Sequence, residues 1–162
     1  LDRTFLAVIS QSYEEEKLPP SANATEGKED GSERVVLRIP AFLAPVKVAI
    51  FPLMKKDGLP EKAREVMDAL KFDFQCLYEE KDAIGKRYRR QDAIGTPFCI
   101  TVDHQSLEDN TVTIRERDTM AQNRVKISEL EGILEEKVSM KGALNKLSIM
   151  SVPMSISNDS KI

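Results

Sequence analysis

From residue 46 onward, the chain alternates short apolar runs with segments whose apolar residues recur at helical spacing. Each run has the length of a strand, and the first is nearly continuously apolar, as expected for a strand covered on both faces of a sheet. The polar segment 103–110 is expected to be a loop, short enough to make the strands on either side antiparallel. The pattern predicts strands at residues 46–53, 72–78, 96–102, 111–115 and 123–127.

Three helices are expected between and after these strands. The first begins at Pro60, since proline is favoured at the first helical position, and it carries an apolar stripe of Ala63, Val66, Met67 and Leu70. The second covers the basic segment 84–94 and is closed by Gly95. The third opens at Ser128, with Glu131 three residues later in the spacing of a capping box. This order predicts an α/β domain whose sheet has parallel strand pairs and helices on its faces.

The two ends of the chain follow other patterns. Residues 2–13 are predicted to be helical, and residues 34–39 are rich in β-branched residues and are predicted to form a strand. Residues 21–33, within a longer connection 18–33, contain no large apolar residue and are expected to be a mobile loop. Residues 141–162 are expected to form a short helix followed by disorder.

Net charge is −3, which by itself argues against a nucleic-acid partner. The segment 84–95 is locally basic, however, and a local field can attract phosphate because it decays over about 8 Å at physiological salt. Its cations are Lys86, Arg87, Arg89 and Arg90, against the single acid Asp92. A solvated helix face would give the same pattern, so both interpretations stay open.

Other features of the sequence limit the class of protein to which the chain can belong. No apolar run is long enough to cross a bilayer, and the first turn, with Asp2 and Arg3, does not resemble a signal peptide. The chain lacks an initiator methionine and is expected to be part of a longer protein. Cys76 and Cys99 lie in apolar runs without a CxxC spacing, which indicates reduced, buried thiols in a cytosolic protein.

Much chemistry is excluded by composition. A single histidine, His104, leaves no Ser-His-Asp or Cys-His arrangement, and no cluster of histidine and cysteine could hold a metal. The glycine-rich signatures of dinucleotide and P-loop sites are also missing. What remains is a binding surface.

The segment 114–122 is the second candidate surface. Arg115, Glu116, Arg117 and Asp118 follow a strand directly, and charged residues of both signs suit recognition of nucleic-acid bases. Gln122 adds an amide that can both donate and accept. An intramolecular ion-pair network would produce the same pattern, and the residues alone do not decide between the two.

At these residues the sequence resembles the glycyl-tRNA synthetase family of class II, homodimeric type. Residues 88–98, YRRQDAIGTPF, resemble the family segment RYxRxDEIGTPF, and residues 111–122, TVTIRERDTMAQ, resemble TVTxRxRDTMxQ. Residues 40–48, PAFLAPVKV, look like the entry to the anticodon-binding domain of that family. The resemblance extends over residues 1–138 except for the loop, and three ordered matches are far more specific than one.

The resemblance implies a five-stranded mixed sheet flanked by three helices that binds the anticodon of glycine tRNA. It divides the chain into a remnant of the catalytic domain at residues 1–39, an anticodon-binding domain at 40–140 and a tail at 141–162. The whole enzyme uses ATP and Mg²⁺ to attach glycine to its tRNA in the cytoplasm and is a homodimer, with no role for DNA or a membrane. This chain is expected to hold no cofactor of its own.

The resemblance also assigns site residues. The expected base readers are Arg115, Glu116, Arg117 and Gln122, and the residues expected on phosphates or base faces are Arg87, Arg89 and Arg90. Residues 1–3 look like the end of class II motif 3, which places Arg3 on the γ-phosphate of ATP. Motifs 1 and 2 are absent, so the chain is expected to bind tRNA without catalysing the reaction.

Two alternatives remain. A synthetase-like accessory module, without ligase activity, would share the fold and bind nucleic acid. A small α/β enzyme of flavodoxin or thioredoxin type would need a cofactor loop or a CxxC motif, and the sequence has neither.

Overall fold

The structure, a computed structural model, describes residues 2–17 and 33–150. Its centre is a five-stranded sheet with the strand order β4-β3-β5-β6-β7. Strand β3 pairs in parallel with both β4 and β5, whereas β6 pairs antiparallel with β5 and β7. The expected mixed α/β sheet is therefore confirmed. The strands are β3 (Val48–Pro52), β4 (Cys76–Tyr78), β5 (Phe98–Val102), β6 (Thr111–Glu116) and β7 (Gln122–Lys126).

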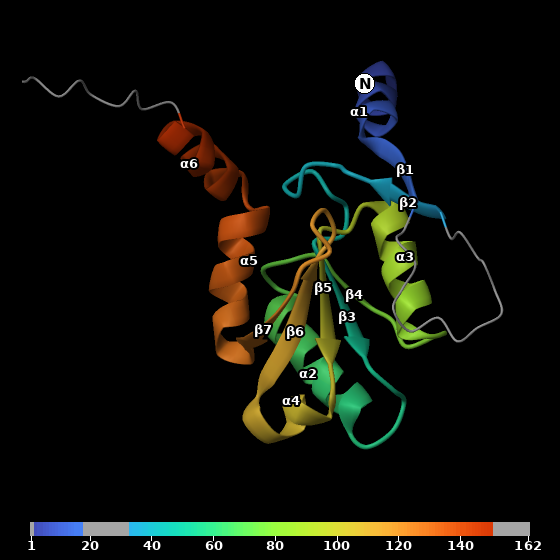
Figure 1. The fold of residues 1–162 in the computed structure, drawn as a ribbon. Coiled ribbons are helices and arrows are strands. Elements are labelled where there is room, and N and C mark those ends of the chain that lie inside the picture. Colours follow the sequence, from blue (N-terminus) through green and yellow to red (C-terminus); the bar gives the residue numbers. More distant parts are fainter. Residues whose placement is uncertain (1, 18–32, 151–162) are drawn as a thin grey trace, which may run out of the picture.

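Helices cover both faces of this sheet (Figure 1). Helices α2 (Leu59–Leu70) and α5 (Leu130–Val138) pack on one face, where their leucines and valines meet the inward side chains of β3, β5 and β6 in the main core. Helix α3 (Ile84–Ile94) packs on the other face, with Ile84 and Tyr88 against Phe51 and Cys99. The parallel half of the sheet is thus buried on both sides, as its continuous apolar runs predicted.

Helix α3 ends as expected at a glycine. Gly95 has φ 85°, a left-handed conformation that side chains disfavour. A Cβ added there would also lie 3.0 Å from the carbonyl oxygen of Leu37. Glycine at this position therefore serves both the helix end and the close approach of a second segment of the chain.

Two expectations about helix starts were wrong. The expected loop 103–110 contains the short helix α4 (His104–Asp109), whose N-cap Asp103 accepts from the Ser106 amide at 3.0 Å. The cap was missed because Ser106, not Glu or Gln, completes the reciprocal bond. Ser128 does not cap α5; it lies in a 3₁₀ turn, η1 (Ile127–Glu129), and α5 begins without a side-chain cap.

The N-terminal part differs from the expectation in one element. Helix α1 (Asp2–Ser12) is followed by β1 (Tyr13–Lys17), which pairs antiparallel with β2 (Glu33–Leu37). The acidic run of residues 14–16 was assigned to no element, because strand propensity is low in glutamate and the pairing partner is distant in sequence. The expected mobile loop 18–33 lies, apart from Glu33, outside the described residues.

Strand β2 packs along α3, with Val36 fully buried between them. The hairpin of β1 and β2 is therefore attached to the sheet through α3, while α1 projects away from both (Figure 1). The division of the chain at residues 39 and 140 stays a prediction.

Helix α6 (Met140–Met150) confirms the helix expected early in the C-terminal tail, and residues 151–162 lie outside the described residues. Over residues 2–17 and 33–150, none of the helices combines the length and the hydrophobicity needed to cross a membrane.

Candidate nucleic-acid interface

Arg115 lies at the end of β6 and points toward α3. Its side chain is 6% exposed, and its two terminal nitrogens donate to both carboxylate oxygens of Asp92, at 2.9 and 3.0 Å. The guanidinium also lies 4.8 Å from the ring centroid of Tyr88. Burial disfavours the charged form, but the hydrogen bonds that Arg115 donates to Asp92 and the negative charge of that carboxylate together outweigh it and raise the pKa of Arg115 above its ordinary value.

Asp92 also binds an arginine from the hairpin. Arg34 of β2 donates from Nε to Asp92 Oδ2 at 2.8 Å, and both side chains are 1% exposed. Its Nη2 donates to the carbonyl oxygen of Arg117 at 2.5 Å, and its Nη1 to Glu16 at 2.9 Å. One buried carboxylate thus joins β2, α3 and β6.

Arg117, in the loop between β6 and β7, is equally enclosed at 3% exposure. Its Nη1 donates to the carbonyl oxygens of Leu37 and Gly95, both at 2.9 Å. Its Nε and Nη2 donate to the carboxylate of Asp118 at 2.7 and 3.0 Å. All of these contacts are within the protein.

Arg87 on α3 is 3% exposed and donates to the backbone carbonyl oxygens of Pro52, Lys81 and Asp82. The expectation that Arg87, Arg115 and Arg117 present their guanidinium groups to RNA is therefore wrong. The alternative left open by the sequence, an intramolecular ion-pair network, describes Arg115 and Arg117. The physical reason is that β2 and α3 cover this end of β6, and a covered guanidinium must be paired.

The remaining expected residues are accessible. Gln122, Arg89 and Arg90 are exposed, and Glu116 is partly exposed. Arg90 forms ion pairs with Glu79 and Asp82 near the start of α3. Arg3 is exposed on α1, and Leu1 of the expected motif lies outside the described residues. Glu116 and Gln122 lie at the same end of β6 and β7 but on different faces, because Gln122 is opposite Arg115, the residue before Glu116.

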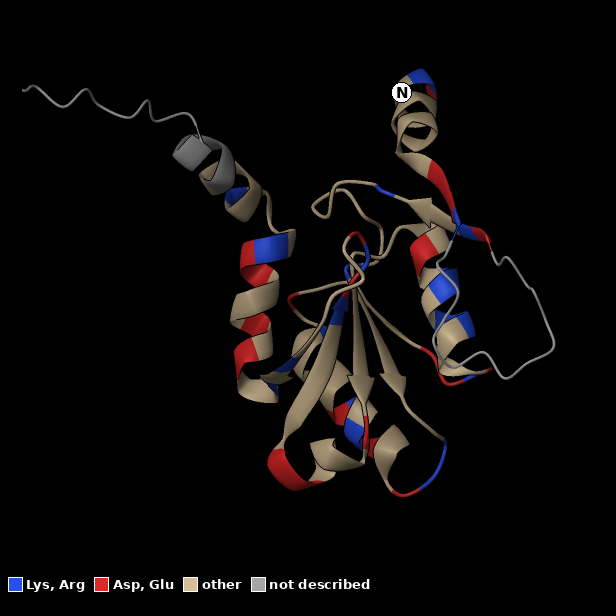
Figure 2. Ribbon diagram, in the orientation of Figure 1, with Lys and Arg blue, Asp and Glu red and all other residues tan. Residues whose placement is uncertain are grey.

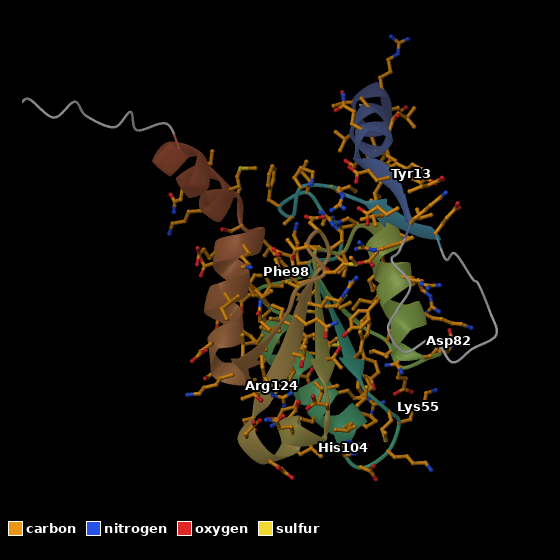
Figure 3. All side chains as sticks on the ribbon, in the orientation of Figure 1. Tyr13, Lys55, Asp82, Phe98, His104 and Arg124 are labelled. Carbon is orange, nitrogen blue, oxygen red and sulfur yellow. The ribbon has the colours of Figure 1, made fainter. Side chains whose placement is uncertain are left out.

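A pocket of about 210 Å³ lies beside Glu116, between α5 and the end of the sheet. Glu116, Asn123 and Lys137 supply its polar groups, and its apolar lining is Phe98, Ile114, Ala121, Val125 and Ile133. Phe98 is labelled in Figure 3 near the end of the sheet at which β6 stops and β7 starts. We call these residues the strand-end pocket.

Charges and hydrogen bonds organise the strand-end pocket. Lys137 Nζ lies 3.6 Å from Glu116 Oε1 and 5.4 Å from the ring centroid of Phe98. The other oxygen of Glu116 accepts from the Thr119 hydroxyl at 2.7 Å. The ring of Phe98 is 4% exposed and forms the buried floor of the pocket, so the groups available to a ligand are the acceptor Glu116, the cationic donor Lys137 and the amide of Asn123.

Sequence reasoning missed Asn123, Lys137 and Phe98 as site residues. Lys137 follows Ile133 by four residues, so it lies on the apolar stripe of α5, and this was an available signal. Phe98 carried no signal, because a phenylalanine in a buried strand is most often a core residue.

The opposite face of β6 and β7 is polar. Gln122 pairs with Arg115, Arg124 with Thr113 and Lys126 with Thr111, and directly opposed residues share a face of the sheet. Gln122, Arg124 and Lys126 are exposed there. Arg124, in the middle of β7, is held by the carboxylate of Asp103, at 2.7 and 2.9 Å. Arg124 and Lys126 therefore lie on the opposite face of the sheet from the strand-end pocket, and Lys126, opposite Thr111, lies at the other end of β6 from Glu116.

A larger pocket of about 450 Å³ lies between α5 and the segment before β4. Its charged lining is mainly acidic, with Asp73, Glu131 and Glu135, and its one cation, Lys47, donates to the carbonyl oxygens of Ala41 and Phe42. Figure 2 shows the acidic bands along α5 that border it. This charge is unsuited to a phosphate backbone, so we assign the candidate interface to the strand-end pocket instead.

Within the described residues, neither the cysteine thiols nor a group of metal ligands forms part of the candidate interface. Cys76 and Cys99 are free, and burial raises the pKa of their thiols to about 11 and about 12. In residues 2–17 and 33–150, no three side chains of His, Cys, Asp or Glu are grouped as metal ligands.

Known proteins share both the sequence and the fold. Residues 47–137 match the family described as "Anticodon binding domain". The glycine–tRNA ligase of Rhodopirellula baltica is 47% identical over 137 residues, which are 85% of this chain and 24% of that protein. That of Treponema denticola is 51% identical over 130 residues, 80% of this chain and 28% of that protein. The chain therefore spans about a quarter of the length of these relatives.

A solved structure, prolyl-tRNA synthetase from Cryptosporidium parvum complexed with L-proline and AMP, has the same fold over 69% of this chain and 26% of its own. The TM-score is 0.57 and the identity 24%. Three sequence segments resembled glycyl-tRNA synthetases. This resemblance is confirmed by the two glycine–tRNA ligases, which are 47% and 51% identical to the chain. Because the family match covers more than half of its length, this chain belongs to the anticodon-binding domain family.

Proposed function

We propose that this chain is the anticodon-binding region of a glycine–tRNA ligase and that it contacts the anticodon loop of glycine tRNA with the strand-end pocket. The family and the names of the relatives support the class of ligand. The observation that carries the location is the set of polar side chains that line the strand-end pocket, Glu116, Asn123 and Lys137.

The chemistry of the strand-end pocket fits an unstacked base. In single-stranded loops, a base that has left its stack can be recognised by hydrogen bonds along its edge. The Glu116 carboxylate accepts from an exocyclic amino group, Lys137 donates to a ring or carbonyl acceptor, and the Asn123 amide can do either. A base with an amino group beside an acceptor matches this set best.

Phosphate contacts fall to Lys137 at the pocket and to the cations of the edge strand β7 on the opposite face of the sheet. Lys137 borders the pocket, and Arg124 and Lys126 line the exposed face of β7. If these three neutralise one phosphate each, log K falls against log salt with a slope of about −2. Affinity is then modest, in keeping with a net charge of −3.

The activity of the longer protein is part of the same proposal. It attaches glycine to its tRNA with ATP and Mg²⁺, as a homodimer in the cytoplasm, and Arg3 on α1 binds the γ-phosphate of ATP there. This chain supplies the contact to the anticodon and positions the tRNA, whereas the catalytic residues lie outside it.

Replacement of Glu116 by glutamine tests the location. Glu116→Gln keeps the shape but removes the charged acceptor, so affinity for glycine tRNA should fall about tenfold, within the roughly 1–3 kcal/mol of a specific base contact. The matched control is Glu108→Gln, an exposed glutamate on α4 at the other end of the sheet. Filter binding at fixed salt measures both, and equal affinities of the two variants would contradict the proposed site.

A further inference from the structure

The β1–β2 hairpin is bonded to the loop that follows Glu116. Arg34 of β2 donates to the carbonyl oxygen of Arg117, and Arg117 donates back to the carbonyl oxygen of Leu37. Arg38, directly after β2, donates to the carbonyl oxygen and the carboxylate of Asp118, at 3.2 and 3.0 Å. Residues of the hairpin and of the loop thus exchange hydrogen bonds in both directions.

The same hairpin residues are fixed from their own side. Arg38 also donates to Glu14 at 2.6 Å and to Glu16, and both glutamates belong to β1. Arg34 is anchored by Asp92, which simultaneously holds Arg115 at the end of β6. The loop is therefore held from the β2 side by one buried and one partly exposed arginine, and glutamates of β1 hold these two arginines in place.

Inside the loop, the hydrogen bonds are short-range: Thr119 donates to Glu116, the Ala121 amide donates to the Thr119 hydroxyl oxygen, and Arg117 donates to Asp118. Its ends are joined by the amide of Glu116 donating to the carbonyl oxygen of Ala121, and the Arg117 amide donates to the carbonyl oxygen of Pro97. Met120 has φ 57°, a left-handed conformation that is unfavourable for a side chain of this kind. A loop that contains such a residue keeps one conformation only where its surroundings hold it there.

We infer that the β1–β2 hairpin positions the RNA-reading end of β6, and that Arg34 and Arg38 are positioning residues for recognition of the tRNA. They act through Arg117 and Asp118 and do not touch the RNA. The inference rests on the proposed function, because it assigns a cause to the geometry of Glu116 and the strand-end pocket. It also gives the segment before the sheet a role in selectivity.

The test compares Arg38→Met and Arg34→Met with the control Arg64→Met. Arg64 is an exposed arginine on α2, which stacks on Tyr78 and touches neither the hairpin nor the loop. Arg38 is partly exposed, so its replacement leaves the buried Asp92 pairs intact and the fold in place. Arg34→Met removes the buried contact and is the more severe change.

Two readouts distinguish positioning from general stability. Hydrogen exchange at the Glu116 and Arg117 amides should accelerate at least tenfold in Arg38→Met, while amides of β3 and β5 exchange as in the unsubstituted chain. The ratio of affinities for glycine tRNA and an anticodon-exchanged tRNA should fall at least fivefold, and Arg38→Lys should restore part of it. Arg64→Met should change neither readout.

Unchanged exchange at Glu116 and Arg117 in both hairpin variants would overturn the inference, whether or not tRNA binds. Faster exchange with an unchanged affinity ratio would also overturn it, because the loop would then have lost its support while the selectivity for the anticodon stayed the same. If the unsubstituted chain binds both tRNAs equally, the proposed function fails, and the exchange data show whether the hairpin still holds the loop.

Discussion

Arginines in this chain divide into those that build the fold and those that remain available to a ligand. Arg34, Arg115 and Arg117 donate to carboxylates and carbonyl oxygens in a space closed by β2 and α3. Their fixed, planar donor groups bridge three segments at once, which a lysine could not do. The count of basic residues in a nucleic-acid-binding segment therefore overstates the number that contact RNA.

At the scale of single residues, replacement of Asp92 should lower the free energy of unfolding most. Asp92→Asn leaves the buried Arg115 without a counter-charge and Arg34 with only the partly exposed Glu16, and breaking a buried pair typically costs about 3–5 kcal/mol. Urea unfolding of the variant should show this loss. Arg90→Met, which removes exposed pairs on the same helix, should cost no more than about 1 kcal/mol. A loss below 1 kcal/mol for Asp92→Asn would mean that the network adds little to the fold.

At the scale of elements, local signals were sufficient where the element depends on its own residues. Helix α3 begins at Ile84 and ends before Gly95, as the sequence predicted, because the glycine fixes the end locally. Strand β1 and helix α4 were not foreseen: the first needs a distant partner strand, and the second uses serine in a capping role expected of glutamate. Pairing and capping chemistry set these elements, not periodicity.

The strand-end pocket shows the same limit. The segment that contains Glu116 could be chosen from its charges, but its depth comes from Phe98 and from Lys137 on α5, which are distant in sequence. Whether Arg115 faces solvent or Asp92 depends on where β2 packs, and no spacing within 84–122 contains that information. The family resemblance identified the segment that contains the candidate site. Only the packing in the structure shows which side chains of that segment are accessible.

The capping carboxylate of α4 predicts a pH dependence. Hydrogen bonds from Arg124, and then from Ser106, outweigh burial and lower the pKa of Asp103 to about 2 from an unfolded value near 3.8. Its charge therefore stabilises the fold above about pH 4, and this contribution disappears as the pH falls toward 2. Asp103→Asn, which keeps a capping side chain, should be less stable than the unsubstituted chain by about 1 kcal/mol at pH 7.

The difference between the two proteins should shrink below pH 4 and vanish near pH 2, and thermal unfolding across this range measures it. A difference of constant size from pH 7 to pH 2 would mean that the cap acts by hydrogen bonding alone.

At the scale of the whole molecule, acidic and basic residues lie in different regions of the surface. Acidic residues line α5 and β1, whereas the cation at the strand-end pocket is Lys137 at the end of α5, and further accessible cations lie on β7 (Figure 2). An acidic protein can therefore present a local site for RNA while most of its surface repels phosphate. Selectivity then has to come from contacts to bases, since the field of the molecule contributes little attraction.

The most direct test of the account is the affinity of this chain for glycine tRNA compared with the same tRNA carrying an exchanged anticodon, measured by filter binding at one salt concentration. Base reading by the strand-end pocket predicts that exchange weakens binding about tenfold or more. Equal affinity for the two tRNAs would contradict the claim that this end of the sheet reads the anticodon.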